Sequence, residues 1–207
     1  LFRSEKSHYA LDTWDLEYKF PFGFKELQGM ANRTDFDLQS HIKHSKKDLS
    51  LFDEETKEKV VPHVVAEPSQ GVDRAFLVFM FDAYEDDPKR GNIVLKLSSK
   101  LAPVKIGVFP LVNKLKDEGR KVYDTLKEEF VCQFDSSGSV GKRYARADEI
   151  GTPYCLTYDF DSVKDKCVTV RDRDSTKQIR VKIEELKEVL RKLLGSEIKF
   201  EEAGKLI

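Results

Sequence analysis

The chain has 207 residues, with 36 lysines and arginines against 37 aspartates and glutamates, so its formal net charge is -1 and a bulk polycation for nucleic acid is excluded. No apolar run approaches the roughly 18–20 residues that a membrane helix needs, so we expect no membrane contact. Cys132, Cys155 and Cys167 are odd in number and form no CxxC pair, which indicates a cytoplasmic protein without zinc or a redox cofactor.

An antiparallel hairpin is predicted near the start of the chain. Residues 14–20 alternate strictly, which predicts a strand with one buried face. A turn at Pro21-Phe22-Gly23 and a returning strand over 24–30 complete the hairpin. The predicted buried face of the first strand comprises Trp14, Leu16, Tyr18 and Phe20.

A helix, a strand and a second helix are predicted next. Thr34 can cap a helix over 35–44, and the charged residues 45–59 indicate a surface excursion. Four valines between positions 60 and 65 predict a β-branched strand. After a turn, a helix is predicted over 72–84. It is apolar nearly all round from Ala75 to Phe81, so we expect it to be buried in a core.

The second half of the chain alternates between short strands and helices. A charged loop at 85–92 and a strand over 92–97 lead to a predicted domain boundary at 98–103, which gives domains of residues 1–99 and 100–207. The pattern beyond it predicts a compact α/β domain of about 100 residues. Its strands are expected at 104–109, 131–134, 154–159, 167–171 and 178–182, its helices at 116–130, 141–149 and 184–194, and a hairpin turn at 161–166.

The segment from Glu67 to Arg74 carries the strongest indication of a binding site. It reads as strand, turn and helix, and it puts a carboxylate, a hydroxyl and an arginine beside a helix N-terminus. A cation there opposes the helix dipole and is tolerated better when an anion binds nearby. The segment suits a ligand with an ammonium group at one end and a phosphate at the other. Alternatively, Glu67 and Ser69 shape a turn.

Other polar residues have both a functional and a structural interpretation. Glu26 on the returning strand is a solvated carboxylate or a ligand for Mg²⁺ on a bound nucleotide. Arg33 forms an ion pair with Asp35 or Asp37, or clamps a carboxylate or phosphate of a ligand. A Gly/Ser loop at 136–139 opens a basic helix, which is a solvated face or a nucleic-acid surface.

Several stretches taken together resemble glycyl-tRNA synthetase of the dimeric class II type. Five lie before residue 75: His8-Tyr9-Ala10, Trp14-Asp15, Pro21-Phe22-Gly23 through Glu26-Leu27, Ala31 through Leu38, and Glu67 through Arg74. The last is similar to the third class II signature motif, which would cover 67–84. Four later stretches are similar to the anticodon-binding domain of that family: 101–105, 135–139, 148–153 and 169–174.

The resemblance implies a fold and an activity. The fold would be α+β in the first part, with some of the antiparallel sheet and helices of a class II synthetase. A mixed-sheet α/β anticodon-binding domain would follow. The activity would be an ATP-dependent ligation, in which glycine is activated as its adenylate and transferred to tRNA-Gly. Mg²⁺ would accompany ATP, and the full-length enzyme would be a homodimer.

The resemblance also implies roles for single residues. The glycine ammonium would be received by Glu5 and Glu67, and the rest of the glycine pocket would comprise Pro68, Ser69, Gln70 and Gly71. ATP would be contacted by Glu26, Leu27, Gly71, Val72, Asp73 and Arg74. Glu26 would hold Mg²⁺, and Glu26 and Arg74 would be catalytic. The arginines suggested for tRNA are Arg143, Arg146 and Arg171.

The sequence departs from the family pattern in two respects. The first two class II motifs are not found in it, and Val65-Ala66-Glu67 carries one residue more than the usual run. The chain begins at Leu1, so we interpret it as part of a longer protein that does not aminoacylate alone. The competing hypothesis is a non-catalytic tRNA-binding or accessory protein with a synthetase-like fold.

Overall fold

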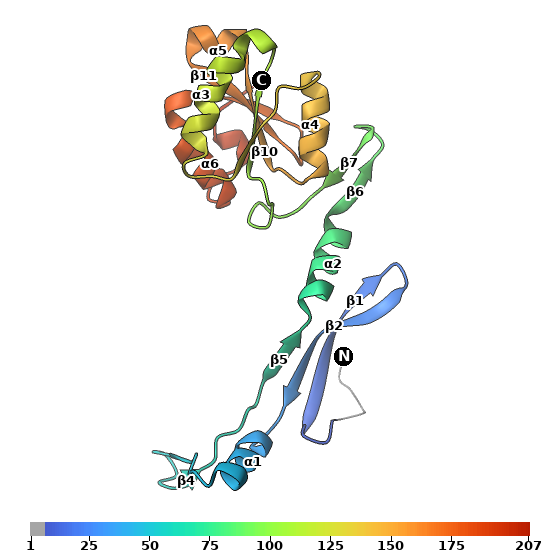
Figure 1. Ribbon diagram of the computed structural model, residues 1–207, viewed down its shortest axis with the longest axis vertical. Coiled ribbons are helices and arrows are strands. Elements are labelled where there is room, and N and C mark those ends of the chain that lie inside the picture. The colour runs from blue at the N-terminus through green and yellow to red at the C-terminus, as the bar shows by residue number, and fades with distance from the viewer. Residues whose placement is uncertain (1–6) are drawn as a thin grey trace. The chain divides into compact units, whose positions relative to one another are not determined.

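The computed structural model describes residues 7–207. The chain divides into two compact units, the first ending at Phe81 and the second covering Asp82–Ile207 (Figure 1). The predicted boundary at 98–103 lies inside the second unit. Among the described residues, no helix has both the length and the apolar character that crossing a membrane requires.

The first unit contains a three-stranded antiparallel sheet in the order β1-β2-β5. The predicted hairpin is confirmed as β1 (Asp12–Phe20) and β2 (Gly23–Asn32). The third strand, β5 (Glu67–Gln70), pairs with β2. The predicted strand over 60–65 is wrong, because the ladder forms over the residues expected to be a turn. Proline lacks an N–H, so Pro62 interrupts a strand there, whereas Pro68 lies on an edge strand, where proline is tolerated.

Smaller elements surround this sheet. The charged excursion contains β3 (Leu51–Phe52) paired with β4 (Lys59–Val60), and Thr34 forms an isolated bridge with Val64. The helix α1 (Phe36–Ser45) forms near its predicted place. Thr34 does not cap it, because Thr34 has a φ of 53° and its hydroxyl donates to the Arg33 carbonyl at 2.6 Å. Asp35 occupies the N-cap position instead.

Apolar faces of the first unit are more exposed than predicted. Trp14 and Leu16 are about half exposed, whereas Asp15, on the other face of β1, is buried. The helix α2 (Val72–Ala83) forms as predicted, yet Phe76 is 66% exposed. The expectation of a buried core helix is wrong, because Phe79 and Phe81 are exposed as well.

The second unit is built on a six-stranded mixed sheet in the order β13-β12-β11-β10-β8-β9. Strand β8 (Ile106–Pro110), next to the edge strand β9 (Cys132–Phe134), runs parallel to both of its neighbours, β9 and β10 (Tyr154–Tyr158). The remaining strands are antiparallel: β11 (Cys167–Asp172), β12 (Gln178–Lys182) and β13 (Lys205–Leu206). The predicted mixed-sheet α/β fold is confirmed.

Helices cover both faces of this sheet (Figure 1). The main core lies between the strands and two helices, α3 (Lys116–Leu126) and α6 (Leu186–Leu194). On the opposite face, α4 (Val140–Glu149) packs Ala147 against Phe109 and Cys155. The predicted turn over 161–166 is wrong, because α5 (Phe160–Asp165) forms there. Its capping box between Asp159 and Ser162 supplies the start signal that was overlooked.

The strand predicted over 92–97 forms, but the charged residues 85–92, predicted as a loop, are part of a hairpin with it. The hairpin consists of β6 (Tyr84–Asp87) and β7 (Asn92–Leu95), and Gly91 has the positive φ of its turn. The turn is anchored within the second unit, because Arg90 donates to the carbonyls of Arg173 at 2.6 Å and Asp174 at 2.7 Å.

Candidate functional site

The pairing of β1, β2 and β5 brings polar side chains onto one face of the first unit's sheet. Asp15 lies opposite Gly29, and Gly29 lies opposite Ser69. Cross-strand partners project to the same face, so Asp15 and Ser69 flank a position without a side chain. Glu67 lies two residues from Ser69 along β5 and therefore shares this face.

A β-bulge brings Glu26 to the same face. Leu16 pairs with Gln28 and Glu17 pairs with Glu26, so Leu27 is the extra residue of β2. A bulge shifts the alternation of the strand and re-aims its side chains. A Cβ atom added to Gly29 would lie 3.6 Å from both Asp15 Oδ1 and Glu26 Oε1. Two carboxylates therefore converge over Gly29.

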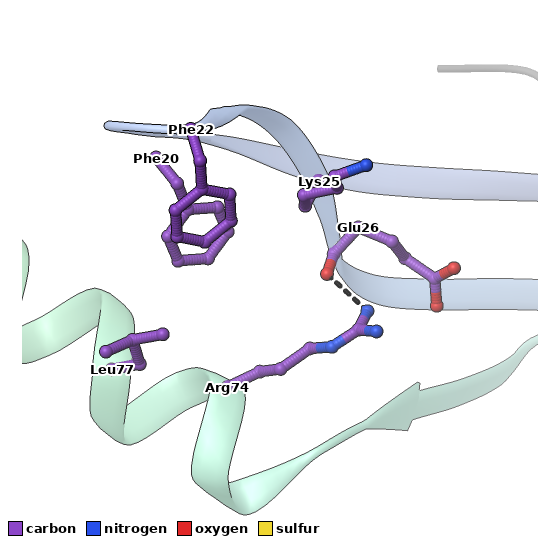
Figure 2. Close-up of a pocket in the computed structure, with 6 residues that line it drawn as sticks. All are labelled: Phe20, Phe22, Lys25, Glu26, Arg74 and Leu77. Carbon is purple, nitrogen blue, oxygen red and sulfur yellow. Dashed lines mark hydrogen bonds between the residues drawn. The ribbon is translucent and has the colours of Figure 1, made fainter.

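A cavity of about 440 Å³ lies beside Glu26 (Figure 2). It is lined by Phe20, Phe22, Lys25, Glu26, Arg74 and Leu77. The rings of Phe20 and Phe22 are stacked with centroids 5.0 Å apart and an interplanar angle of 6°. The cavity thus combines an apolar aromatic wall with a cation, which suits a ligand that has a planar ring and an anionic group.

Arg74 reaches across this cavity from the first turn of α2. Figure 2 shows its guanidinium pointing toward β2, where NH1 donates to the Glu26 carbonyl at 2.6 Å. A guanidinium has five N–H donors, so this bond leaves donors for an anion. The side chain is exposed. Its reach away from its own helix accounts for an arginine at a helix N-terminus, where a cation opposes the dipole.

Arg33 has carboxylate partners within the chain. It contacts both oxygens of Asp37, at 2.5 and 2.8 Å, and its NH1 donates to Glu67 Oε2 at 3.0 Å. The hydrogen bonds from Arg33 lower the pKa of Asp37 and, reciprocally, raise the pKa of Arg33. Of the two acids considered for pairing, Asp37 is therefore the partner.

The other residues assigned to the first site by resemblance lie around these groups. Leu27 is half-buried at the bulge, and Pro68 and Gln70 lie opposite Met30 and Gln28 on the other face of the sheet. The residues at the start of α2, namely Gly71, Val72 and Asp73, are exposed. Glu5 lies outside the described residues.

The carboxylates of this face can accommodate one kind of cation site. Within residues 7–207, no group of three or more His, Cys, Asp or Glu side chains could hold a metal ion. Mg²⁺ is commonly bound by one or two carboxylates together with phosphate oxygens. The convergence of Glu26 and Asp15 fits that donor set, with a ligand supplying the remaining oxygens.

In the second unit, two of the three arginines suggested for tRNA are buried. Arg143 is 3% exposed and donates to the Pro110 carbonyl and to the carbonyl of Gly138 at 2.6 Å. Arg171 is 7% exposed and forms a two-point ion pair with Asp148 at 2.9 and 3.0 Å. Both side chains are therefore engaged in holding the fold.

Arg146 is the exposed arginine of the three. Its side chain is 46% exposed, and it contacts Asp135 at 2.6 Å and the Ser137 carbonyl at 2.8 Å. It lies on α4, which begins at the N-cap Ser139, whose side chain accepts a hydrogen bond from the Lys142 amide. Arg146 is therefore positioned beside the Gly/Ser loop and remains accessible to a ligand.

Sequence reasoning overlooked several residues of these sites. The strict alternation put Asp15 opposite the predicted buried face, and Phe20, Phe22 and Lys25 were given no role in binding a ligand. The available signal for the cavity was the Phe20-Pro21-Phe22-Gly23 turn, in which two aromatic residues precede a carboxylate by a few positions. No local pattern in the sequence indicates that Asp148 is the buried partner of Arg171.

Known proteins are similar to this chain along most of its length. Residues 105–193 match the family described as anticodon binding domain. The glycine–tRNA ligase of Acetivibrio thermocellus is 56% identical over 187 residues, which cover 89% of this chain and 40% of that protein. The glycine–tRNA ligase of Ruminiclostridium cellulolyticum is 54% identical with the same coverage. That of Caldanaerobacter subterraneus subsp. tengcongensis is 50% identical over 93% of this chain and 42% of its own length. The chain thus spans about two fifths of the length of these relatives.

Proposed function

We propose that this chain, a homologue of glycine–tRNA ligases along 89% of its length, provides part of an enzyme that activates glycine with ATP and transfers it to tRNA-Gly. The observation that carries the proposal is the identity of 50–56% to three such ligases. The arrangement of Glu26, Glu67 and Arg74 in the first unit supports it, because these groups suit the two substrates.

In this proposal the first unit forms one side of the activation site. Glu67 receives the glycine ammonium, and Ser69 and Gly71 line a small pocket beside it. Glycine has no side chain to recognise, so selection depends on the pocket's size and on carboxylates that a wrong ligand would leave unpaired. Resemblance also assigns Glu5, Pro68 and Gln70 to glycine, but Pro68 and Gln70 lie on the opposite face of the sheet from Glu67 and Ser69, so they would support this segment rather than line the pocket.

ATP would occupy the cavity beside Arg74. The stacked Phe20 and Phe22 offer an apolar surface to the base, and Arg74 offers donors to the phosphates. Attack of the glycine carboxylate on the α-phosphate requires no protein nucleophile. It requires alignment of the two reactants and stabilisation of the developing charge. Mg²⁺, held by Glu26 with Asp15, would supply further charge neutralisation when bound.

The second unit would bind the anticodon region of tRNA-Gly. The match of residues 105–193 to anticodon binding domains supports this role. Phosphate contacts need accessible cations, so Arg146 is a better candidate than the buried Arg143 and Arg171.

We also propose a cytoplasmic enzyme that is a homodimer at full length. A non-catalytic tRNA-binding protein is the second candidate, and the match to the anticodon-binding family favours it equally.

A comparison of two proteins tests the catalytic proposal. The first is the purified 207-residue chain, and the second is the ligase graft, in which this chain replaces its matching segment in the Acetivibrio thermocellus enzyme. We expect glycine-dependent exchange of pyrophosphate into ATP from the graft and none from the chain, since the chain corresponds to two fifths of such an enzyme. Exchange by the chain alone would contradict the expectation, and an inactive, folded graft would favour the non-catalytic candidate.

Replacement of Arg146 with glutamate should weaken binding of tRNA-Gly by the 207-residue chain. The loss of one phosphate contact should lower the slope of log affinity against log salt by about 1. Filter binding across a salt series measures both quantities. Arg191→Glu is the matched control, because Arg191 is 59% exposed and pairs with Glu129 at 2.6 Å. Equal losses in the two variants would point to net charge rather than to a local contact.

A further inference from the structure

Arg33 lies at the junction of three elements in the first unit. It follows β2 directly, Asp37 lies in the first turn of α1, and Glu67 begins β5. The backbone is closed at the same place, because the Arg33 amide donates to the Val64 carbonyl at 2.9 Å and the Val64 amide donates to the Thr34 carbonyl at 2.7 Å. Arg33 is thus held through both its backbone amide and its side chain.

The surroundings of Arg33 restrict its orientation. Its Cζ atom lies 4.1 Å from the centroid of the Tyr9 ring, and Asp37 takes two of its nitrogens in a two-point contact. Stacking on an aromatic face and pairing with a carboxylate in the plane are complementary for a flat guanidinium. NH1 is left to point at Glu67, and the Arg33 side chain is 20% exposed.

The contact with Glu67 engages one carboxylate oxygen. Oε2 accepts from Arg33 at 3.0 Å, whereas Oε1 accepts no hydrogen bond from residues 7–207. The Glu67 side chain is 40% exposed. A carboxylate held through one oxygen is fixed in orientation and presents the other oxygen, which is the arrangement needed to receive an ammonium group.

We infer that Arg33, itself fixed by Asp37 and Tyr9, is a positioning residue that orients Glu67 for the glycine ammonium. This inference rests on the proposed function. It differs from a direct ligand clamp, because Arg33 acts through Glu67. It predicts that loss of Arg33 weakens recognition of glycine specifically, since Arg74 and the aromatic pair of the ATP cavity do not contact Arg33 in the described residues.

The test uses the ligase graft and compares Arg33→Met with the unsubstituted protein. We expect the KM for glycine to rise by roughly 10–100-fold, the range typical of losing a group that orients a binding residue. The KM for ATP should stay unchanged. Arg33→Lys should show a smaller rise, because lysine retains the charge but cannot bridge Asp37 and Glu67 at once.

Asp37 provides a second, independent test. Asp37→Asn should raise the KM for glycine less than Arg33→Met does. The double variant should be no worse than Arg33→Met alone, because Asp37 acts through Arg33 and the two effects are not additive. Gln39→Ala is the control on the same helix. Gln39 is exposed and its amide contacts Asp35 at 3.1 Å, and the variant should retain both KM values.

The outcomes separate this inference from the proposed function. Two outcomes would assign Arg33 a merely structural role and overturn the inference. One is an equal rise in the KM values for glycine and ATP, and the other is a lower melting temperature with an unchanged KM for glycine. A folded, unsubstituted graft without glycine-dependent exchange would overturn the proposed function itself, and this inference with it.

Discussion

Replacing Asp148 with alanine should destabilise the second unit by about 3–5 kcal/mol, the cost of leaving one member of a buried ion pair without its partner. Asp148 is 1% exposed, and both of its oxygens contact Arg171 at 2.9 and 3.0 Å. Arg90 approaches the same carboxylate at 3.5 Å. The variant would therefore leave the buried guanidinium of Arg171 without its carboxylate in the interior between α4 and the sheet.

The measurement is urea unfolding followed by two signals. Far-UV circular dichroism reports mainly on the helices of the second unit. Trp14 is the chain's single tryptophan and lies in the first unit, so its fluorescence serves as an internal reference. We expect the circular dichroism midpoint to fall and the Trp14 midpoint to stay in place. Equal shifts in both signals would contradict a destabilisation confined to the second unit.

Two further variants separate charge burial from packing. The double variant Asp148→Leu with Arg171→Met should recover much of the lost stability, because an apolar pair of similar volume removes the stranded charge. Lys121→Met breaks an exposed pair with Glu118 at 2.8 Å on α3 and should leave the midpoint unchanged. If the double variant is as unstable as Asp148→Ala, lost packing rather than lost pairing is responsible.

The fold of the second unit followed closely from the sequence because the helices that pack on its sheet belong to the same unit. Strand β8, Ile106–Pro110, is buried throughout, and α6 buries Leu186, Leu190 and Leu193 at helical spacing. An apolar run or stripe predicts burial correctly when the elements that cover it belong to the same compact unit. The helix α5 was missed because its six residues are too short to display a period.

The first unit shows what periodicity cannot determine. The alternation of β1 was identified correctly, yet neither face is buried along its whole length: Asp15 and Phe20 lie on opposite faces and are both buried, whereas Trp14 and Leu16 are exposed. Alternation defines two faces of a strand but does not say which face another element covers. Phe76 and Phe79 on α2 are exposed for a related reason. An apolar helix surface predicts burial, but the sequence does not say which side of the helix another element covers.

The sequence suggested residues for the candidate site, whereas their geometry could not be predicted from it. Resemblance pointed to Glu26, Glu67 and Arg74, and the contact between Arg74 and the Glu26 carbonyl joins two of them. The convergence of Glu26 and Asp15 depends on a bulge at Leu27, which has no local signature in the sequence. The pairing of β5 with β2 is a long-range contact, so it was likewise invisible to local patterns.

Replacing Arg74 with alanine should lower glycine-dependent pyrophosphate exchange by the ligase graft by about 100–1,000-fold, the loss typical of removing one preorganised donor from a site where charge develops. The side chain offers N–H donors beside the aromatic wall of the cavity, and its NH1 bond to the Glu26 carbonyl fixes its direction. Both contributions disappear in the variant. Steady-state exchange assays with varied ATP should show a lower kcat together with a higher KM for ATP.

Matched variants distinguish charge from geometry at this position. Arg74→Lys keeps a cation but lacks the planar fork, so we expect activity between that of the alanine variant and that of the unsubstituted graft. Lys19→Ala removes an exposed cation from β1 outside the cavity and should retain full activity. Binding of tRNA-Gly should persist in all three variants, because the proposed anticodon contacts belong to the second unit. If Arg74→Ala retains exchange while the Lys19 control behaves as expected, the cavity beside Arg74 is not where the nucleotide phosphates are stabilised, and the assignment of ATP to it fails.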